Sequence, residues 1–559
     1  VAFSNEQIRP QARPQLAILL SGVLLVILTL WALRAGRDIG WNLDRDAVQE
    51  SLRTRVETDH FIIHVDPSVS PERLRRIVED HEHRYRQLTT FFKTEPDGKI
   101  VSFIYRNRAQ KARLMGAQRT QIARPWNREV HIDGFRVPHP VLKHELAHVF
   151  AGKLATGPFK VPAVAGIFVN IGVVEGIAVA ADWRVRELTV HGWTKAMQGL
   201  GLMPDLRKSL DVFGFWSISS SRAYTVAGSF FRYLVDKYGI EKFGVLYATN
   251  DFTAAYEQSL DALVTEWEAF LKGIPLPQDD LLVAEHRFKR PSIFQKVCPH
   301  VAANISSRGY ARLHSGDLEG AQADLEQIYG YAPANPTPLI ALAEGFARAE
   351  RFEEAQAFVE RALEAPGATL KGKTQAIEAR ANLAWREDRT EDAVKDYAVV
   401  KERHLSTPSD RLQQARIMAL TRTSTAVTDL MRDVLLSDQK PQRGLARLAE
   451  ASVTIRNVPL VHYLYARALE RAGAYPEAVE AAARAVELDI GGDPLKTEAI
   501  LTYGRLLWWD GKAHEAAVVF DAIAQNHASP AMTAAAADWA DRARFTAAKT
   551  STRSPSLIE

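Results

Sequence analysis

Patterns of apolar residues divide the first half of the chain into short elements. HFIIHVD (60–66), KIVSFIYRN (99–107) and REVHID (128–133) have the apolar and β-branched composition of strands. PERLRRIVEDHEHRYRQLTTFF (71–92) repeats its apolar residues at helical spacing, and a short helix is predicted near 108–116. Strands and helices in this order predict an α+β domain.

A further helix, containing VLKHELAHVFAG, is predicted after Pro138 and Pro140, because proline is tolerated in the first turn of a helix. We expect the strand before it to lie at a sheet edge, where an extended peptide could pair with it. The segment 161–181 is apolar for most of its length. Asn170 and Glu175 argue against a membrane span and favour a buried core helix, while an interfacial surface in contact with lipid stays open.

After about residue 300 the chain becomes Ala-rich, with a recurring helical pattern. Five segments share an anchoring alanine, at spacings of 34, 38, 85 and 38 residues: Ala321, Ala355, Ala393, Ala478 and Ala516. The spacing of 85 leaves room for two degenerate units. The segments resemble tetratricopeptide repeats (TPRs), in which a small residue lets paired helices approach closely. A generic helical solenoid or bundle is the alternative.

The N-terminal region contains eighteen residues without a charge, from Leu16 to Leu33, which is long enough to span a bilayer. Trp31, Leu33 and Arg34 end this run where a signal peptide would have small residues, so an uncleaved anchor is favoured. Basic residues flank both sides and hardly fix the orientation. We expect a cytoplasmic N-terminus and a catalytic domain at the periplasmic face of a bacterial inner membrane.

Composition narrows the chemistry. A chain of 559 residues is too long to fold around one hydrophobic core, so several domains are expected. The 70 Lys and Arg residues nearly balance 67 Asp and Glu, and this balance suggests no nucleic-acid partner. Because Cys298 is the single cysteine, a metal must be held by His, Asp or Glu.

The segment HELAH (144–148) is the strongest candidate for chemistry. Residues at i and i+4 share one face of a helix, so His144 and His148 can bind one metal while Glu145 faces a water on that metal. Two histidines on an ordinary helix are the alternative. A catalytic zinc ion needs a third protein ligand and keeps one open position.

Twenty-seven residues after His148, VVEGIAVAAD places Glu175 in a second helix with small residues. HExxH followed by such a Glu-Gly-x-Ala segment is typical of gluzincin metallopeptidases, and residues 55–275 resemble bacterial membrane-anchored peptidases of this clan, although the linker here is longer and more apolar. The resemblance implies a zincin-like domain that binds Zn²⁺ through His144, His148 and Glu175. Glu175 as an ordinary helix carboxylate is the alternative.

Two further residues are candidates. SRAYTVAGSFFRYLVDKYG (221–239) resembles the aromatic-rich helix of such peptidases, which implies that Tyr224 hydrogen-bonds the oxyanion. A core tyrosine with its hydroxyl at the surface is the alternative. Asp182 could orient a ligand histidine or be a solvated carboxylate, and it is the first replacement if Glu175 is not a ligand.

These predictions combine into a membrane-anchored zinc metallopeptidase, with Glu145 as general base, that hydrolyses protein or peptide substrates and binds a protein partner through its repeats. The alternative is a non-catalytic repeat scaffold or envelope assembly factor that retains a zinc-binding, peptidase-like domain. The expected order is an N-terminal tail (1–15), a transmembrane helix (16–33), a linker (34–58), the metallopeptidase domain (59–275), a linker (276–300), an all-α TPR-like solenoid (301–545) and a disordered tail (546–559).

Overall fold

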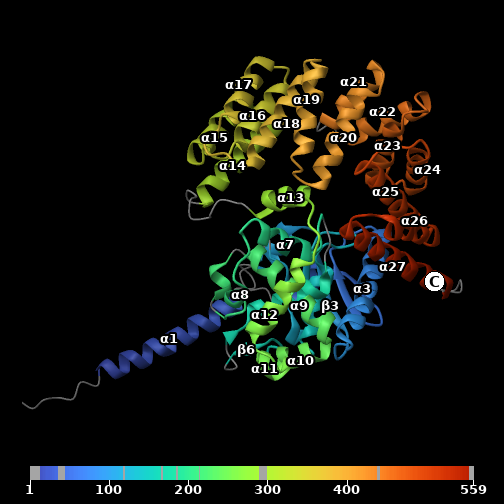
Figure 1. The fold of residues 1–559 in the computed structure, drawn as a ribbon. Coiled ribbons are helices and arrows are strands. Elements are labelled where there is room, and N and C mark those ends of the chain that lie inside the picture. The colour runs from blue at the N-terminus through green and yellow to red at the C-terminus, as the bar shows by residue number, and fades with distance from the viewer. Residues whose placement is uncertain are drawn as a thin grey trace, which may run out of the picture. The chain divides into compact units, whose positions relative to one another are not determined.

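The protein forms two compact units by its internal contacts (Figure 1). The computed structural model describes residues 13–35, 45–117, 120–164, 168–183, 187–212, 214–218, 220–288, 299–436 and 441–552. The first unit consists of residues 1–182, 206–218 and 230–263, and the second of residues 183–205, 219–229 and 264–559. Helices α9 (Ser220–Tyr238) and α12 (Leu260–Lys272) contribute to both units. The chain therefore passes between the units several times before residue 264.

A five-stranded sheet of order β1-β2-β3-β5-β4 lies in the first unit. The sequence predicts its three parallel strands, which are β2 (Phe61–Val65), β3 (Ile100–Tyr105) and β5 (Glu129–Asp133). It does not predict the antiparallel edges, β1 (Thr54–Glu57) and β4 (Ile122–Arg124), because four and three residues are too few for a periodic pattern. The expectation that the strand before HELAH is an edge strand is wrong, since β4 pairs with the outer side of β5.

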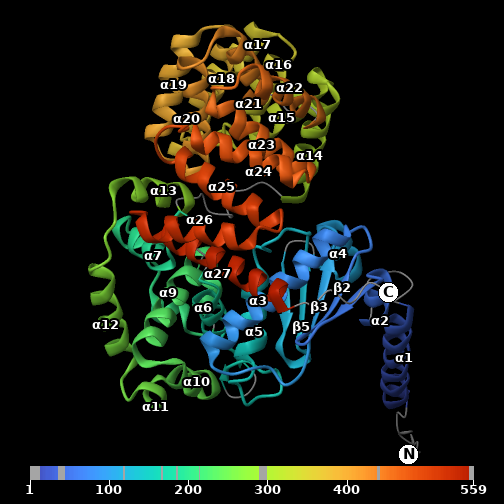
Figure 2. The ribbon, with the colours of Figure 1, turned by 90° about the vertical axis from the view of Figure 1, so that its right-hand side faces the viewer.

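Helices cover both faces of this sheet, and every residue of β3 is buried as a result. On one face β3 forms an apolar cluster with α2 (Arg45–Ser51) and α4 (Arg108–Met115). On the other face Tyr85 lies edge-on against Phe61 and Phe150, with ring centroids 5.8 and 5.0 Å apart. Figure 2 shows these elements, which are α2 (Arg45–Ser51), α3 (Pro71–Phe92), α4 (Arg108–Met115) and α5 (Leu142–Ala151). Both the predicted long helix and the predicted short helix are confirmed.

The apolar segment 161–181 forms a hairpin followed by a buried helix. Strand β6 (Ala163–Val164) pairs with β7 (Phe168–Val169), and α6 (Ile171–Asp182) begins directly afterwards. Eight of the twelve residues of α6 are buried, so the predicted core helix is confirmed for this part. Also in the first unit are η1 (Pro125–Asn127), α8 (Leu206–Ser209), η2 (Gly214–Ser217), α10 (Ile240–Thr249) and α11 (Phe252–Tyr256).

Helix α1 (Arg13–Ala35) extends over the N-terminal apolar run as 23 residues of continuous helix. Its large apolar side chains are exposed, from 49% for Val23 to 72% for Ile18. Across the residues that the structure describes, no helix is both long and apolar enough to cross a membrane. The transmembrane helix expected over 16–33 is therefore not confirmed.

In its described residues the second unit contains helices and no strand. Its two short early helices are α7 (Val190–Gly199) and α13 (Gln278–Phe288), so the linker predicted over 276–300 contains a helix. The rest of the unit consists of α14 (Pro299–Ser315), α15 (Leu318–Tyr331), α16 (Thr337–Arg348), α17 (Phe352–Leu363), α18 (Leu370–Arg386), α19 (Thr390–Glu402), α20 (Thr407–Thr421), α21 (Thr425–Leu436), α22 (Pro441–Thr454), α23 (Pro459–Ala472), α24 (Tyr475–Glu487), α25 (Leu495–Trp509), α26 (Ala513–Asn526) and α27 (Pro530–Thr552). The tail predicted from 546 is thus helical up to Thr552, and 553–559 lie outside the described residues.

The anchoring alanines behave as the repeat pattern predicts. All five are 0% exposed, and they lie on α15, α17, α19, α24 and α26. A side chain this small lets the neighbouring helix pack closely, as helix-pair repeats require. Between Ala393 and Ala478 the structure has α20 to α23, and α23 packs against α24. Because α23 forms a pair with α24, the interval contains one other pair, α20 and α21, and the additional helix α22. The two units predicted for this interval are therefore one pair and one single helix.

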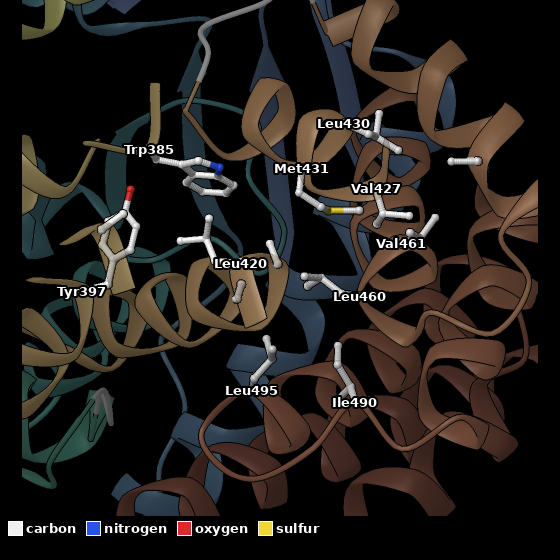
Figure 3. Close-up of a cluster of buried hydrophobic side chains, with 14 of the residues drawn as sticks. Trp385, Tyr397, Leu420, Val427, Leu430, Met431, Leu460, Val461, Ile490 and Leu495 are labelled. Carbon is white, nitrogen blue, oxygen red and sulfur yellow. The ribbon is translucent and has the colours of Figure 1, made fainter. Parts of the chain in front are cut away.

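A continuous apolar core joins neighbouring repeats in this region. Figure 3 shows Trp385 of α18 and Tyr397 of α19 near side chains from the later helices, and these two rings lie 6.2 Å apart at centroid. The same cluster contains residues from α20, α21, α23 and α25, including Leu420, Met431, Leu460 and Leu495. Stacked pairs that share one core are the expected architecture of helical repeats.

Candidate metal centre

Two helices of the first unit bring His144, His148 and Glu175 together. Helix α5 presents the two histidines one turn apart, with their ring centroids separated by 4.9 Å. Helix α6 packs against α5 and contributes Glu175 from its fifth position. One ligand atom from each residue lies within 4.8 Å of the other two. In the described part of the chain, this is the one group of three or more His, Cys, Asp or Glu residues close enough to hold a metal ion.

The ligand atoms point to a common centre. Glu175 Oε2 lies 3.2 Å from His144 Nε2 and 3.8 Å from His148 Nε2. The three side chains keep 17%, 9% and 20% of their surface exposed for His144, His148 and Glu175, so a small fourth ligand can reach them. Two imidazole nitrogens and one carboxylate oxygen form the donor set of a catalytic zinc site. The residues present therefore fit a zinc ion.

Burial and pairing determine the charges of these groups. Burial lowers the pKa of His148 to about 4, so its ring is neutral, as metal binding requires. Burial also acts to lower the pKa of His144, but its hydrogen bond to Glu175 and the nearby carboxylates raise the pKa overall. For Glu175, burial acts to raise the pKa, and the two histidines lower it overall. In the metal-free protein the hydrogen bond between His144 and Glu175 thus favours the charged form of both side chains.

Glu145 is 6% exposed and follows His144 on α5. Burial raises its pKa to about 7, with smaller contributions from His144, which lowers it, and from Glu175 and Asp182, which raise it. Asp182 is the last residue of α6 and does not belong to the ligand group, yet its charge acts on both His144 and Glu145. This agrees with a role for Asp182 outside the ligand set. Tyr224 lies half-buried on α9 in the second unit, and its role at the oxyanion stays a prediction.

Asn170, whose polarity argues against a membrane span, also fixes the start of α6. Its side-chain oxygen accepts a hydrogen bond from the Val173 amide at 3.3 Å. Its side-chain nitrogen donates to the Leu210 carbonyl and to Asn250 Oδ1, both at 2.9 Å. An asparagine directly before a helix is a recognisable N-cap signal, but its partners 40 and 80 residues away are not predictable from local pattern.

The helix pairs of the second unit, with buried alanines at repeat spacing, define a helical-repeat region. Residues 312–368 match the tetratricopeptide repeat family, which confirms the TPR character of this segment. A structure of Pseudomonas aeruginosa pilF is 16% identical, covers 42% of this chain and 96% of its own, and has a TM-score of 0.21. The TPR2AB domain of yeast Sti1 in complex with pHSP90 is 12% identical, covers 44% of this chain and 99% of its own, and has a TM-score of 0.18. No curated protein matches the chain.

Proposed function

We propose that the protein is a zinc-dependent peptidase whose TPR-like region binds a protein partner. The observation that supports the peptidase most directly is the convergence of His144, His148 and Glu175 from two packed helices, with Glu145 adjacent to the first ligand. The HExxH and Glu-Gly-x-Ala segments resemble gluzincins in the same residues.

Each residue then has a distinct task. His144, His148 and Glu175 would hold the ion, which when bound makes water a stronger nucleophile and polarises a carbonyl group. Glu145 accepts the proton of the attacking water and returns it to the leaving amine. The charge of Asp182 acts on both His144 and Glu145 and favours their protonated forms. Tyr224 is proposed to stabilise the oxyanion, as the resemblance implies.

The sheet supports a peptide as the substrate. Strand β4 is an edge strand that packs against α5, the helix with both histidines. An extended peptide can add to such an edge through backbone hydrogen bonds. This would place a peptide bond next to the helix that supplies Glu145.

The decisive experiment compares zinc content and protein cleavage in full-length variants. Glu145→Gln should keep one zinc per chain and lose cleavage of an unfolded protein such as casein by about 10²-fold or more, because glutamine cannot accept the proton. His144→Ala, His148→Ala and Glu175→Ala should lower zinc content, because each removes a ligand. Glu241→Gln, at an exposed carboxylate of the same unit, is the control that should behave as wild type. Unchanged cleavage by Glu145→Gln would refute the peptidase.

A non-catalytic scaffold is the second candidate, and the TPR match over 312–368 favours it. Helical repeats present extended binding surfaces, and such binding requires no general base. The same Glu145→Gln variant separates the two functions inside cells. If it replaces the wild-type gene without loss, the role of the protein is binding. If it fails while remaining folded and abundant, the role is catalysis.

Attachment to a membrane through α1 also remains a proposal. Its support is the row of exposed apolar side chains between Ile18 and Trp31. Burial of such side chains in lipid would remove a large apolar area from water. We place the catalytic unit on the periplasmic side, and cleavage of the chain by added protease in spheroplasts tests that side.

A further inference from the structure

A cavity of about 360 Å³ lies within the helical repeats of the second unit. Its lining comes from α20, α21, α23 and α25 and from the additional helix α22. The lining residues lie between 408 and 498, beyond the segment 312–368 that matches the TPR family. A cavity of this size can hold a small ligand or side chains of a partner. The irregular part of the repeats is therefore a candidate binding site.

Arginines gather around one carboxylate of this cavity. The side chain of Glu498 on α25 is 8% exposed and lines the cavity together with Arg411 and Arg467. Its carboxylate accepts hydrogen bonds from Arg411, from Arg467 at 3.3 Å and from Arg505 at 2.9 Å. Burial acts to raise the pKa of Glu498, and the three arginines lower it overall, so the carboxylate is charged. A fourth arginine, Arg471, also lines the cavity.

These four arginines outnumber the carboxylates that pair with them. Apart from the shared carboxylate on α25, Arg467 has one other acidic neighbour, Glu470 at 3.4 Å. The second carboxylate in the lining, Asp433, forms an ion pair with Arg447. Arg471 is exposed in the last turn of α23, and its side chain has no ion pair within the described residues. The cavity therefore has an excess of positive charge.

The arginines also have N–H groups to spare. A guanidinium group carries five N–H donors in a planar fork that fits a carboxylate. In the described structure the side chain of Arg411 uses one of these donors, in its hydrogen bond to Glu498. The same lining contains the partly exposed leucines Leu412, Leu445 and Leu464. The cavity thus combines unused donors for an anion with apolar surface for the groups next to that anion.

We propose that this cavity binds an Asp or Glu side chain from an extended segment of a protein partner, with a neighbouring apolar side chain against the leucines. The inference rests on the proposed binding of a partner by the TPR-like region and names the chemistry of that partner. Charge complementarity selects the occupant, because guanidinium groups bind carboxylates through paired, charge-assisted hydrogen bonds. A purely structural role in neutralising Glu498 would not require Arg471, which makes no contact with that carboxylate within the described residues.

The test uses the full-length protein with Glu145→Gln as the parent, so that a bound peptide is not cleaved. A phage library of random octapeptides should yield sequences enriched in Asp or Glu beside a large apolar residue. Fluorescence anisotropy then measures the dissociation constant of the most frequent peptide. Arg471→Gln should weaken its binding about 10-fold to 100-fold, because a hydrogen bond to a charged group is lost. An amide in place of the acidic side chain of the peptide should weaken binding to the parent equally and add little to the loss in Arg471→Gln.

Arg484→Gln is the matched control, because it changes the net charge equally on α24, outside the cavity, at a side chain that is 43% exposed. Its affinity for the peptide should equal that of the parent. Equal affinities of Arg471→Gln and Arg484→Gln, or selected peptides without acidic residues, would overturn the inference and leave the binding role of the repeats.

Two other outcomes would reach further. A library from which the protein selects no peptide would overturn both the inference and the proposed binding of a partner by the repeats. A labelled oligothymidylate that binds more tightly than any peptide, and loses this binding in Arg471→Gln, would assign the cavity to phosphate groups and overturn the acidic peptide. Neither outcome bears on the peptidase, which zinc content and protein cleavage test separately.

Discussion

His81 makes the stability of the first unit depend on pH in a direction that can be calculated. The ring is 1% exposed on α3. Its Nδ1 donates to the Ile77 carbonyl at 2.8 Å and its Nε2 accepts from the Ser102 hydroxyl of β3 at 2.9 Å. The neutral ring satisfies both partners in this way, because its unprotonated Nε2 has a lone pair that accepts the hydroxyl proton.

Burial lowers the pKa of His81 to about 4, against 6.5 in the unfolded chain. The hydrogen bond to Ile77 and the charges of Asp80 and Glu82 act in the opposite direction, and His139 lowers the pKa slightly further. Because the folded pKa is the lower one, the unfolded chain binds the proton first as the pH falls. Stability is therefore complete above pH 6.5 and decreases until pH 4 is reached. At about 1.4 kcal/mol per pH unit, the loss amounts to about 3 kcal/mol.

The hydrogen exchange of backbone amides within residues 71–92 of the full-length protein reports the opening of the first unit specifically. This exchange should be measured in urea between pH 7 and pH 4. The His81→Gln variant has no imidazole to titrate at this position. Between pH 7 and pH 4, its free energy of unfolding should therefore fall by about 3 kcal/mol less than that of the wild type. The substitution also disturbs a buried hydrogen bond and should cost about 1–3 kcal/mol at pH 7, but that offset is constant with pH. His314→Gln, at an exposed histidine of α14, is the control and should follow the wild type. Parallel pH profiles of His81→Gln and wild type would refute the reasoning.

The remaining predictions concern the repeats and the N-terminus. Ala355→Leu should destabilise the second unit by about 1–3 kcal/mol through overpacking, whereas Ala357→Leu on the same helix is exposed and should stay within about 0.5 kcal/mol in urea unfolding. Equal effects at the two positions would contradict the packing role of the alanines. Removal of 1–35 should leave a folded protein that elutes identically with and without detergent in size-exclusion chromatography, because the first strand begins at Thr54. Continued dependence on detergent would implicate the exposed hairpin side chains Val164 and Phe168.

Local signals explain which elements are predictable from the sequence. Helix α3 matches its predicted bounds because an amphipathic run of 22 residues is preceded by Ser70, whose hydroxyl accepts from the Arg73 amide at 3.3 Å. The anchoring alanines are predictable for a similar reason, since their spacing records a packing requirement repeated along the chain. Strand β4 has no such signal, because its three residues become a strand only through pairing with β5. The boundaries of the two units are also not predictable from local sequence, since residues 183–205 and 219–229 join the second unit through long-range contacts.

The candidate site shows the same division between local and long-range information. The pair His144 and His148 is predictable because one helical turn alone brings the rings together. Glu175 can be nominated from sequence, but its carboxylate reaches the histidines only if α6 packs on α5 in the correct orientation.

That orientation depends on Asn170, with partners at Leu210 and Asn250, and on the absence of a side chain at Gly172. None of these residues is a type that metal chemistry demands, so a search for ligands passes over them. The positions that align a ligand are therefore recognised from the packing around the motif, as Asn170 and Gly172 are at the start of the helix that carries Glu175.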